Sequence, residues 1–115
     1  SMGGYVALEV MRRAPSRVTR LALLDTSARA DTEEGRQNRE RLIALAQGGR
    51  YSEIDAALWP RLVAPARLSD RALAETVTRM RRETGPEAFV RQQRAIMGRV
   101  DSRADLPAIE IPVLV

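Results

Sequence analysis

Three residues at the start of the chain have the types and spacing that could support nucleophilic chemistry. Ser1, Met2 and Gly3 directly precede an apolar stretch with helical spacing, and they match the second half of the G-x-S-x-G turn that presents a reactive serine between a strand and a helix. The backbone of that turn is strained and another segment passes close to it, so Gly3 should stand where no side chain fits. The free N–H groups at a helix start would let the backbone amide of Met2 stabilise a developing oxyanion.

The chain lacks the partners that this serine would need. It contains no histidine and no cysteine, whereas a serine nucleophile ordinarily passes its proton to a nearby histidine. We therefore expect the 115 residues to be inactive by themselves. The same absences exclude disulfides and metal sites built on thiolate or imidazole ligands, so we expect no metal and no cofactor.

The stretch after the serine should position it. Residues 3–13 place apolar side chains on one helical face, and Pro15 prevents the helix from continuing. Residues 18–25 form a compact apolar run that ends in a polar cluster, which is typical of a strand buried on both faces. Helix, tight turn and buried strand in this order indicate a parallel sheet.

Between residues 31 and 98 the sequence becomes helical, with repeated start and stop signals and no further strand pattern. Gly48 and Gly49 suit a left-handed helix exit, and Pro60 should kink or split the helix in which it lies. We expect four helices here: from Asp31 or Thr32 to Gln47, from Ser52 across Pro60, from a Ser69 cap to Gly85, and from Pro86 to about Met97.

The last residues return to strand character. Residues 100–107 are polar and include a proline, whereas residues 111–115 are the apolar run IPVLV, which predicts a strand. The pattern alone therefore predicts helix, strand, helical insertion and strand, without an internal repeat or a low-complexity segment.

Two stretches resemble the α/β-hydrolases that carry a helical cap. SMGGYVALEVMRRAPSRVTRLALLDTSARAD is similar to their nucleophile elbow, following helix and next strand. DSRADLPAIEIPVLV resembles the linker that leads from the cap back into the sheet. The first stretch is the more specific, because its motif, spacing and element order agree, whereas Pro-Val-Leu-Val strands are common.

The resemblance implies an α/β fold, here a mostly helical fragment of a parallel sheet with a helical cap insertion. Residues 1–30 would belong to the hydrolase core, residues 31–99 to the cap, and residues 100–115 to the linker and the next core strand. It implies Ser1 as nucleophile, Met2 as a backbone oxyanion donor and Gly3 as the small elbow residue. The intact enzyme would attack a small-molecule ester, lactone or similar substrate through an acyl-serine intermediate, with the histidine and the acid supplied by residues outside this chain.

Alternatives to these assignments remain at the sequence level. Asp25 or Asp105 could be taken for the acid of the triad, although a solvated or capping role is the simpler interpretation of Asp25. Ser1-Met2 could also be left by removal of a purification tag, and a terminal serine could instead use its own amine as the base. A different class of function is a helical interaction or dimerisation module, which would form a homodimer or exchange strands with a second copy.

Large apolar side chains of the helical block could line a substrate pocket. Trp59, Phe89 and Met97 are our candidates for substrate binding. Apolar residues at helical spacing also form ordinary helix cores, which is the simpler interpretation of each.

The amino-acid composition limits which classes of partner the chain could bind. All 19 basic residues are arginine, and the formal net charge is +4. The arginines are spread along the chain among Asp and Glu, as on solvated helix faces, and the aromatic residues are too scattered to stack bases, so we expect no nucleic-acid partner. No apolar run approaches the roughly 20 residues of a membrane span, so we expect no membrane partner and a cytoplasmic location.

Overall fold

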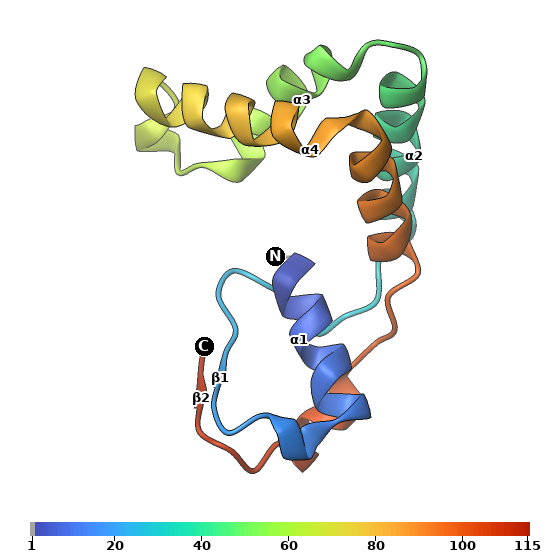
Figure 1. The fold of residues 1–115 in the computed structure, drawn as a ribbon, viewed down its shortest axis with the longest axis vertical. Coiled ribbons are helices and arrows are strands. Elements are labelled where there is room, and N and C mark those ends of the chain that lie inside the picture. Colours follow the sequence, from blue (N-terminus) through green and yellow to red (C-terminus); the bar gives the residue numbers. More distant parts are fainter. Residues whose placement is uncertain (1) are drawn as a thin grey trace. The chain divides into compact units, whose positions relative to one another are not determined.

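The computed structural model describes residues 2–115 and divides into two compact units (Figure 1). The described residues up to Thr32 and the segment Ala95–Val115 form one unit, which we call the strand unit. Glu33–Arg94 form the other, which we call the helical unit. The chain thus passes from the strand unit into the helical unit after residue 32 and returns after residue 94. That these units are a hydrolase core and its cap remains a prediction.

Helix α1 (Met2–Arg13) opens the strand unit, as the apolar spacing predicts. Leu8 and Met11 lie on its buried face. The amide of Ala14 donates to the carbonyl oxygen of Val10 at 2.8 Å, and Pro15 then begins the short 3₁₀ turn Pro15–Arg17 because it cannot supply the next helical N–H.

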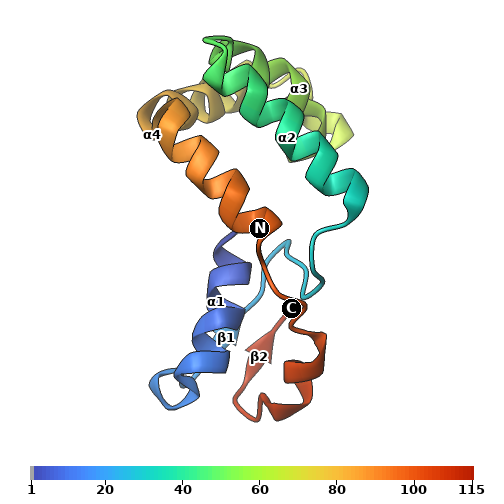
Figure 2. The same ribbon diagram turned by 90° about the vertical axis from the view of Figure 1, so that its right-hand side faces the viewer.

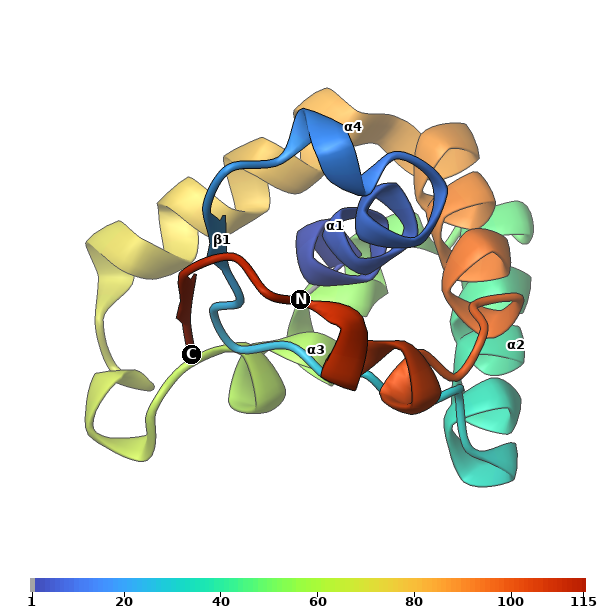
Figure 3. The same ribbon diagram turned by 90° about the horizontal axis from the view of Figure 1, so that it is seen from below.

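Strand β1 (Leu21–Ala22) pairs with strand β2 (Val113–Leu114), and the two are parallel, as expected from the element order. Figure 3 shows them side by side. Backbone hydrogen bonds run from the Leu21 amide to Pro112 at 3.1 Å and from the Leu23 amide to Leu114 at 2.9 Å. The strand is shorter than the predicted 18–25 and Leu24 is 67% exposed, because among the described residues only β2 pairs with β1.

Helix α2 (Glu33–Gln47) opens the helical unit and buries Leu42, Ile43 and Ala46. Its predicted left-handed exit is confirmed, since Gly49 has φ of 76°. The Arg50 amide donates to the Leu45 carbonyl at 2.9 Å, which is the long bond of a Schellman motif.

Helix α3 (Ile54–Leu62) follows the 3₁₀ turn Tyr51–Glu53 and contains Pro60. Of the two expected effects of Pro60, a split does not occur, because the helix continues past it to Leu62, and a kink stays a prediction. A proline this close to the C-terminal end removes one hydrogen bond of the last turn, so little helix remains for it to disrupt.

Helix α4 (Arg71–Met97) contains a break at Gly85, whose φ of 75° and ψ of 162° are not helical. Residues 71–84 and 86–97 are therefore separate helices, and the predicted fourth helix beginning at Pro86 is confirmed. The predicted Ser69 cap is wrong by one residue, because the Leu73 amide donates to the Asp70 carboxylate at 2.9 Å. This bond, aided by Arg67, lowers the pKa of Asp70, as expected for a carboxylate at a helix N-terminus.

The core of the helical unit centres on Ile54, which is fully buried, with Phe89 and Val90. In Figures 1 and 2, α3 lies beside the first half of α4 and α2 beside its second half. The Tyr51 and Phe89 rings meet edge to face at 5.5 Å, and the Arg39 guanidinium donates to the Gln93 side chain at 2.8 Å. Apolar packing and a few polar bonds therefore hold these helices together.

Candidate functional site

The first turn of α1 is the part of the predicted site that the structure describes. Met2 is the first residue of this helix and is half-buried. The first N–H groups of a helix have no intrahelical acceptor, and α1 carries no acidic residue in its first turn. Its N-terminal end therefore carries a partial positive charge that no acidic side chain of its own first turn offsets. Ser1, the predicted nucleophile, lies outside the described residues.

Gly4 allows the loop after β1 to approach α1 closely. A Cβ atom on Gly4 would lie 2.2 Å from the Thr26 hydroxyl oxygen and 2.5 Å from both the Cβ and the methyl carbon of Thr26. A Cβ on Gly3 would meet no atom within 4 Å among the described residues. The close approach visible here therefore requires glycine at position 4, a residue that the sequence analysis did not single out, although the doubled glycine Gly3-Gly4 was the available signal. The elbow role of Gly3 stays a prediction, since it depends on a segment that this chain does not contain.

The two aspartates considered as triad acids have different surroundings. Asp25 directly follows the β1 segment, is exposed and has φ of 46°, a left-handed conformation that aspartate tolerates better than most residues. Asp105 lies in the 3₁₀ helix Arg103–Ala108, with its carboxylate 3.7 Å from Arg12 Nε. Asp105 thus forms an ion pair with a residue of α1.

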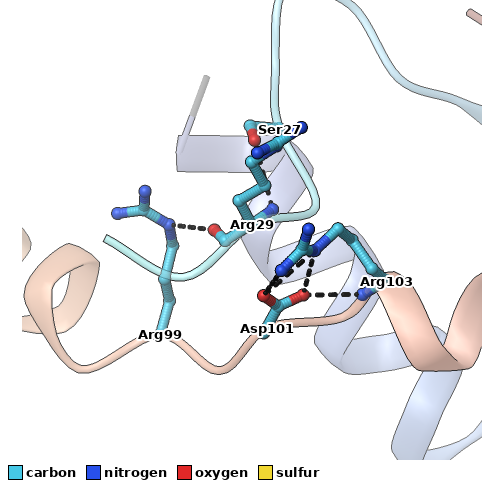
Figure 4. A network of polar contacts seen from close by, with 5 residues as sticks. All are labelled: Ser27, Arg29, Arg99, Asp101 and Arg103. Carbon is cyan, nitrogen blue, oxygen red and sulfur yellow. Dashed lines mark hydrogen bonds and ion pairs between the residues drawn. The ribbon is translucent and has the colours of Figure 1, made fainter. Parts of the chain in front are cut away.

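A polar network joins the loop after β1 to the segment after α4 (Figure 4). Arg99 Nε donates to the Arg29 carbonyl oxygen at 2.9 Å, and the Arg29 amide donates to the Ser27 hydroxyl at 3.1 Å. The Arg103 guanidinium donates to the Asp101 carboxylate at 2.6 Å. Hydrogen bonds from Arg103, reinforced by its charge, hold the pKa of Asp101 well below its ordinary range.

A hollow of about 550 Å³ runs along α1 within the strand unit. Its walls are mostly apolar and include Val6 and Val10, which are 54% and 40% exposed. Its lining also includes Met2, Ser27 and Ile96. An apolar group could therefore be accommodated beside the helix whose first turn carries the predicted oxyanion donor.

The three predicted substrate-binding residues do not form one cluster. Trp59 is half-buried and its indole N–H donates to the Leu68 carbonyl at 3.0 Å. Phe89 is only 6% exposed and packs in the core of the helical unit, so its burial gives no support to substrate contact. Met97 ends α4 in the strand unit and is half-buried. Substrate contact by any of them stays a prediction.

Residues 2–115 hold no group of three or more acidic side chains that could bind a metal ion. In the same range, no helix is long and apolar enough to cross a membrane.

Comparison with known proteins gives a match among solved structures. No family model matches the chain, and neither does any curated protein. Among solved structures, the chain superposes with a TM-score of 0.88 on a thermophilic esterase from Thermogutta terrifontis, determined with malate bound. The chain resembles an esterase. The two sequences are 31% identical, and the alignment covers 98% of this chain but 42% of the esterase. The chain thus spans less than half the length of the structure it resembles.

Proposed function

We propose that this chain is the segment of a serine-dependent α/β-hydrolase that runs from the nucleophile through the cap to the next sheet strand. The observation that carries the proposal is the superposition on an esterase over 98% of the chain, in a sequence that opens with Ser-Met-Gly-Gly before a helix. The parallel pairing of β1 with β2 supports it, because a helical insertion between two parallel strands is the arrangement that the resemblance implies.

In the proposed reaction the Ser1 hydroxyl oxygen attacks the carbonyl carbon of an ester or lactone. A histidine from outside these residues accepts the hydroxyl proton and then passes it to the leaving alkoxide as the carbon–oxygen bond breaks. The products of this half-reaction are an acyl-serine and an alcohol, which stays attached when the substrate is a lactone. Water, deprotonated by the same histidine, then attacks the acyl carbon, releases the carboxylic acid and restores the serine.

The start of α1 would stabilise the negative charge that develops on the carbonyl oxygen. The Met2 amide supplies one donor, and the absence of acidic residues from the first helical turn leaves the positive helix end uncompensated. A second donor would come from outside this chain. Gly4 contributes indirectly, since its lack of a side chain lets Thr26 lie against the first turn.

The hydrolase proposal is tested by ester hydrolysis. A polypeptide that contains residues 1–115 and the rest of the proposed fold should hydrolyse a small aryl ester such as p-nitrophenyl acetate. Ser1→Ala should reduce kcat by at least a thousandfold, whereas Ser52→Ala, at an exposed serine of the helical unit, should leave it unchanged.

Equal hydrolysis by the wild type and Ser1→Ala would contradict the proposal. A chain of 12.8 kDa that associates with a second copy and never hydrolyses an ester would instead favour the interaction module, to which the exposed Val6 and Val10 would contribute an apolar face.

A further inference from the structure

Four successive residues of the loop after β1 contact the segment after α4. The Ser102 amide donates to the Ala28 carbonyl at 2.8 Å, and Arg99 Nε donates to the Arg29 carbonyl at 2.9 Å. The Ala30 amide donates to the Asp101 carboxylate, and the Asp31 carboxylate lies 3.0 Å from Arg99 Nη1. We call residues 28–31 and 99–102 the clasp.

The clasp joins the two chain connections of the helical unit. Residue 32 is the last of the strand unit before that unit begins, and residue 95 is the first after it ends. All residues of the clasp belong to the strand unit. The segment by which the chain leaves the strand unit is therefore hydrogen-bonded to the segment by which it returns.

Arg99 makes more of these contacts than any other described residue of the clasp. Besides Arg29 and Asp31, its Nη1 donates to the Ile96 carbonyl at 2.9 Å in the last turn of α4. Its guanidinium carbon lies 4.4 Å from the centre of the Tyr5 ring. The Arg99 and Asp31 side chains are only 13% and 5% exposed, so their ion pair is shielded from water and from salt.

Tyr5 connects the clasp to the predicted reaction centre. It lies on α1 three residues after Met2, which is about one helical turn. A cation held over an aromatic ring is attracted to its face. The position of the Arg99 guanidinium is therefore coupled to the turn of α1 that presents the predicted oxyanion donor.

We propose that Arg99 is a positioning residue that fastens both connections of the helical unit to each other and to the first turns of α1. A displacement of either connection would then move Arg99, shift the Tyr5 side chain and so change the position of the Met2 amide. The link to Met2 rests on the hydrolase proposal, whereas the clasp and its link to Tyr5 do not.

The geometry specifically requires arginine. Its planar fork places Nε on one carbonyl and Nη1 on a second carbonyl and a carboxylate, while the carbon of the same group lies over an aromatic ring. A lysine ammonium offers one point charge and cannot make these contacts from separate nitrogens.

The clasp is tested by amide hydrogen exchange on the chain itself, which requires no catalytic activity. Arg99→Met should speed exchange at the Ser102 and Ala30 amides by at least tenfold, and Arg99→Lys should restore only part of the protection. The matched control is Arg91→Met, because Arg91 is a 70% exposed arginine of α4 with one weak ion pair. It should leave both amides as slow as in the wild type. Unchanged exchange at both amides in folded Arg99→Met would overturn the clasp.

The link to Tyr5 is tested by a double-mutant cycle of Arg99→Met with Tyr5→Leu, read as equilibrium constants for unfolding. The two changes together should differ from the product of the single effects by roughly threefold to tenfold. Independent effects would overturn the link to α1 and leave the clasp standing.

If Arg99→Met does not fold, Asp31→Asn provides the same tests with Arg99 in place. It should speed hydrogen exchange at the Ser102 amide. It should also reduce the coupling between Arg99 and Tyr5 when the double-mutant cycle is repeated in the Asp31→Asn background, with Arg99→Lys in place of Arg99→Met. An unchanged exchange rate together with an unchanged coupling would overturn the proposal. Failure of the hydrolase proposal would appear instead as an absence of ester hydrolysis, with the exchange pattern intact.

Discussion

Arg99 in the strand unit and Arg81 in the helical unit are both largely buried, yet their surroundings differ. Arg99 has acceptors for Nε and Nη1, and its guanidinium carbon lies 4.4 Å from the centre of the Tyr5 ring. Arg81 pairs with Asp55 through Nη2, while its buried Nη1 has no hydrogen-bond partner among the described residues. Burial lowers the pKa of Arg81, which is the direction expected for a cation with incomplete compensation.

This difference in hydrogen-bond partners indicates that the fold depends more on Arg99 than on Arg81. A buried guanidinium that is bonded through two of its nitrogens orders the segments around it, whereas one with an orphaned buried donor carries an unrecovered desolvation cost. The Arg99 cluster joins segments about 70 residues apart in sequence, as its bond to Arg29 shows. The Arg81 guanidinium instead pairs with Asp55 of α3, within the helical unit. The Tyr51 hydroxyl donates to the backbone carbonyl of Arg81 at 3.1 Å and does not involve its charge.

The sharpest way to test this comparison is to remove Arg99. Arg99→Met should lower the free energy of unfolding by roughly 3–5 kcal/mol, because it removes the buried ion pair with Asp31 and the hydrogen bonds to the Arg29 and Ile96 carbonyl oxygens. Urea denaturation followed by circular dichroism measures this change. A loss below about 1 kcal/mol, the range of an exposed pair, would show that the Arg99 contacts do not order the strand unit.

Gly4 and Gly3 provide a matched pair within the strand unit. Gly4→Ala should destabilise the chain by about 1–3 kcal/mol, since the new methyl group overlaps Thr26. Gly3→Ala should be neutral or stabilise by up to about 1 kcal/mol, because alanine favours a helix and its Cβ would meet no atom of residues 2–115 within 4 Å. Thermal unfolding of both variants gives the comparison. Equal destabilisation by the two would contradict the contact between Gly4 and Thr26.

Arg81→Met should cost less than Arg99→Met. The change removes an orphaned donor together with the charge, and the Asp55 side chain it leaves unpaired is 32% exposed and can be hydrated. We expect a loss of about 1–2 kcal/mol in the same urea experiment. A loss as large as that of Arg99→Met would mean that the two buried arginines contribute alike.

The smallest expected effect is the contribution of Asp101, a residue of the clasp, to the stability of the fold at low pH. Hydrogen bonds from Arg103 lower the pKa of Asp101 in the folded state, so Asp101 stabilises the fold above its ordinary pKa. That contribution falls as the pH drops from the ordinary value towards the lowered one. Asp101→Asn should therefore reduce stability at pH 7 and flatten the loss of stability between about pH 4 and pH 2. Parallel pH profiles of the wild type and the variant would contradict this role.

The elements with strong local signals were predictable from the sequence. The Gly48-Gly49 exit and the Gly85-Pro86 break depend on backbone conformations that glycine and proline determine locally, and both were confirmed. The Ser69 cap was misplaced because Asp70, one residue later, is an equally good cap and also binds Arg67. The burial of the β1 segment was overestimated, since burial depends on neighbours outside the segment.

The contacts of the candidate site were only partly predictable. Ser1-Met2-Gly3 is a local motif that the sequence displays directly. The clasp depends instead on pairs such as Arg29 with Arg99, whose sequence separation hides them when the chain contains 19 arginines. The contact between Gly4 and Thr26 likewise arises from folding of the loop after β1 against α1 and has no signature beyond the second glycine.

The measurement that tests the central proposal most directly is covalent labelling with a fluorophosphonate, which reacts with activated serines. The polypeptide that carries these residues is treated with the probe, its intact mass is measured, and the labelled peptide is sequenced. The hydrolase proposal predicts a mass well above 12.8 kDa and a single adduct on Ser1 that is lost in Ser1→Ala. An adduct on another serine, or no adduct on a folded polypeptide of that larger mass, would contradict it.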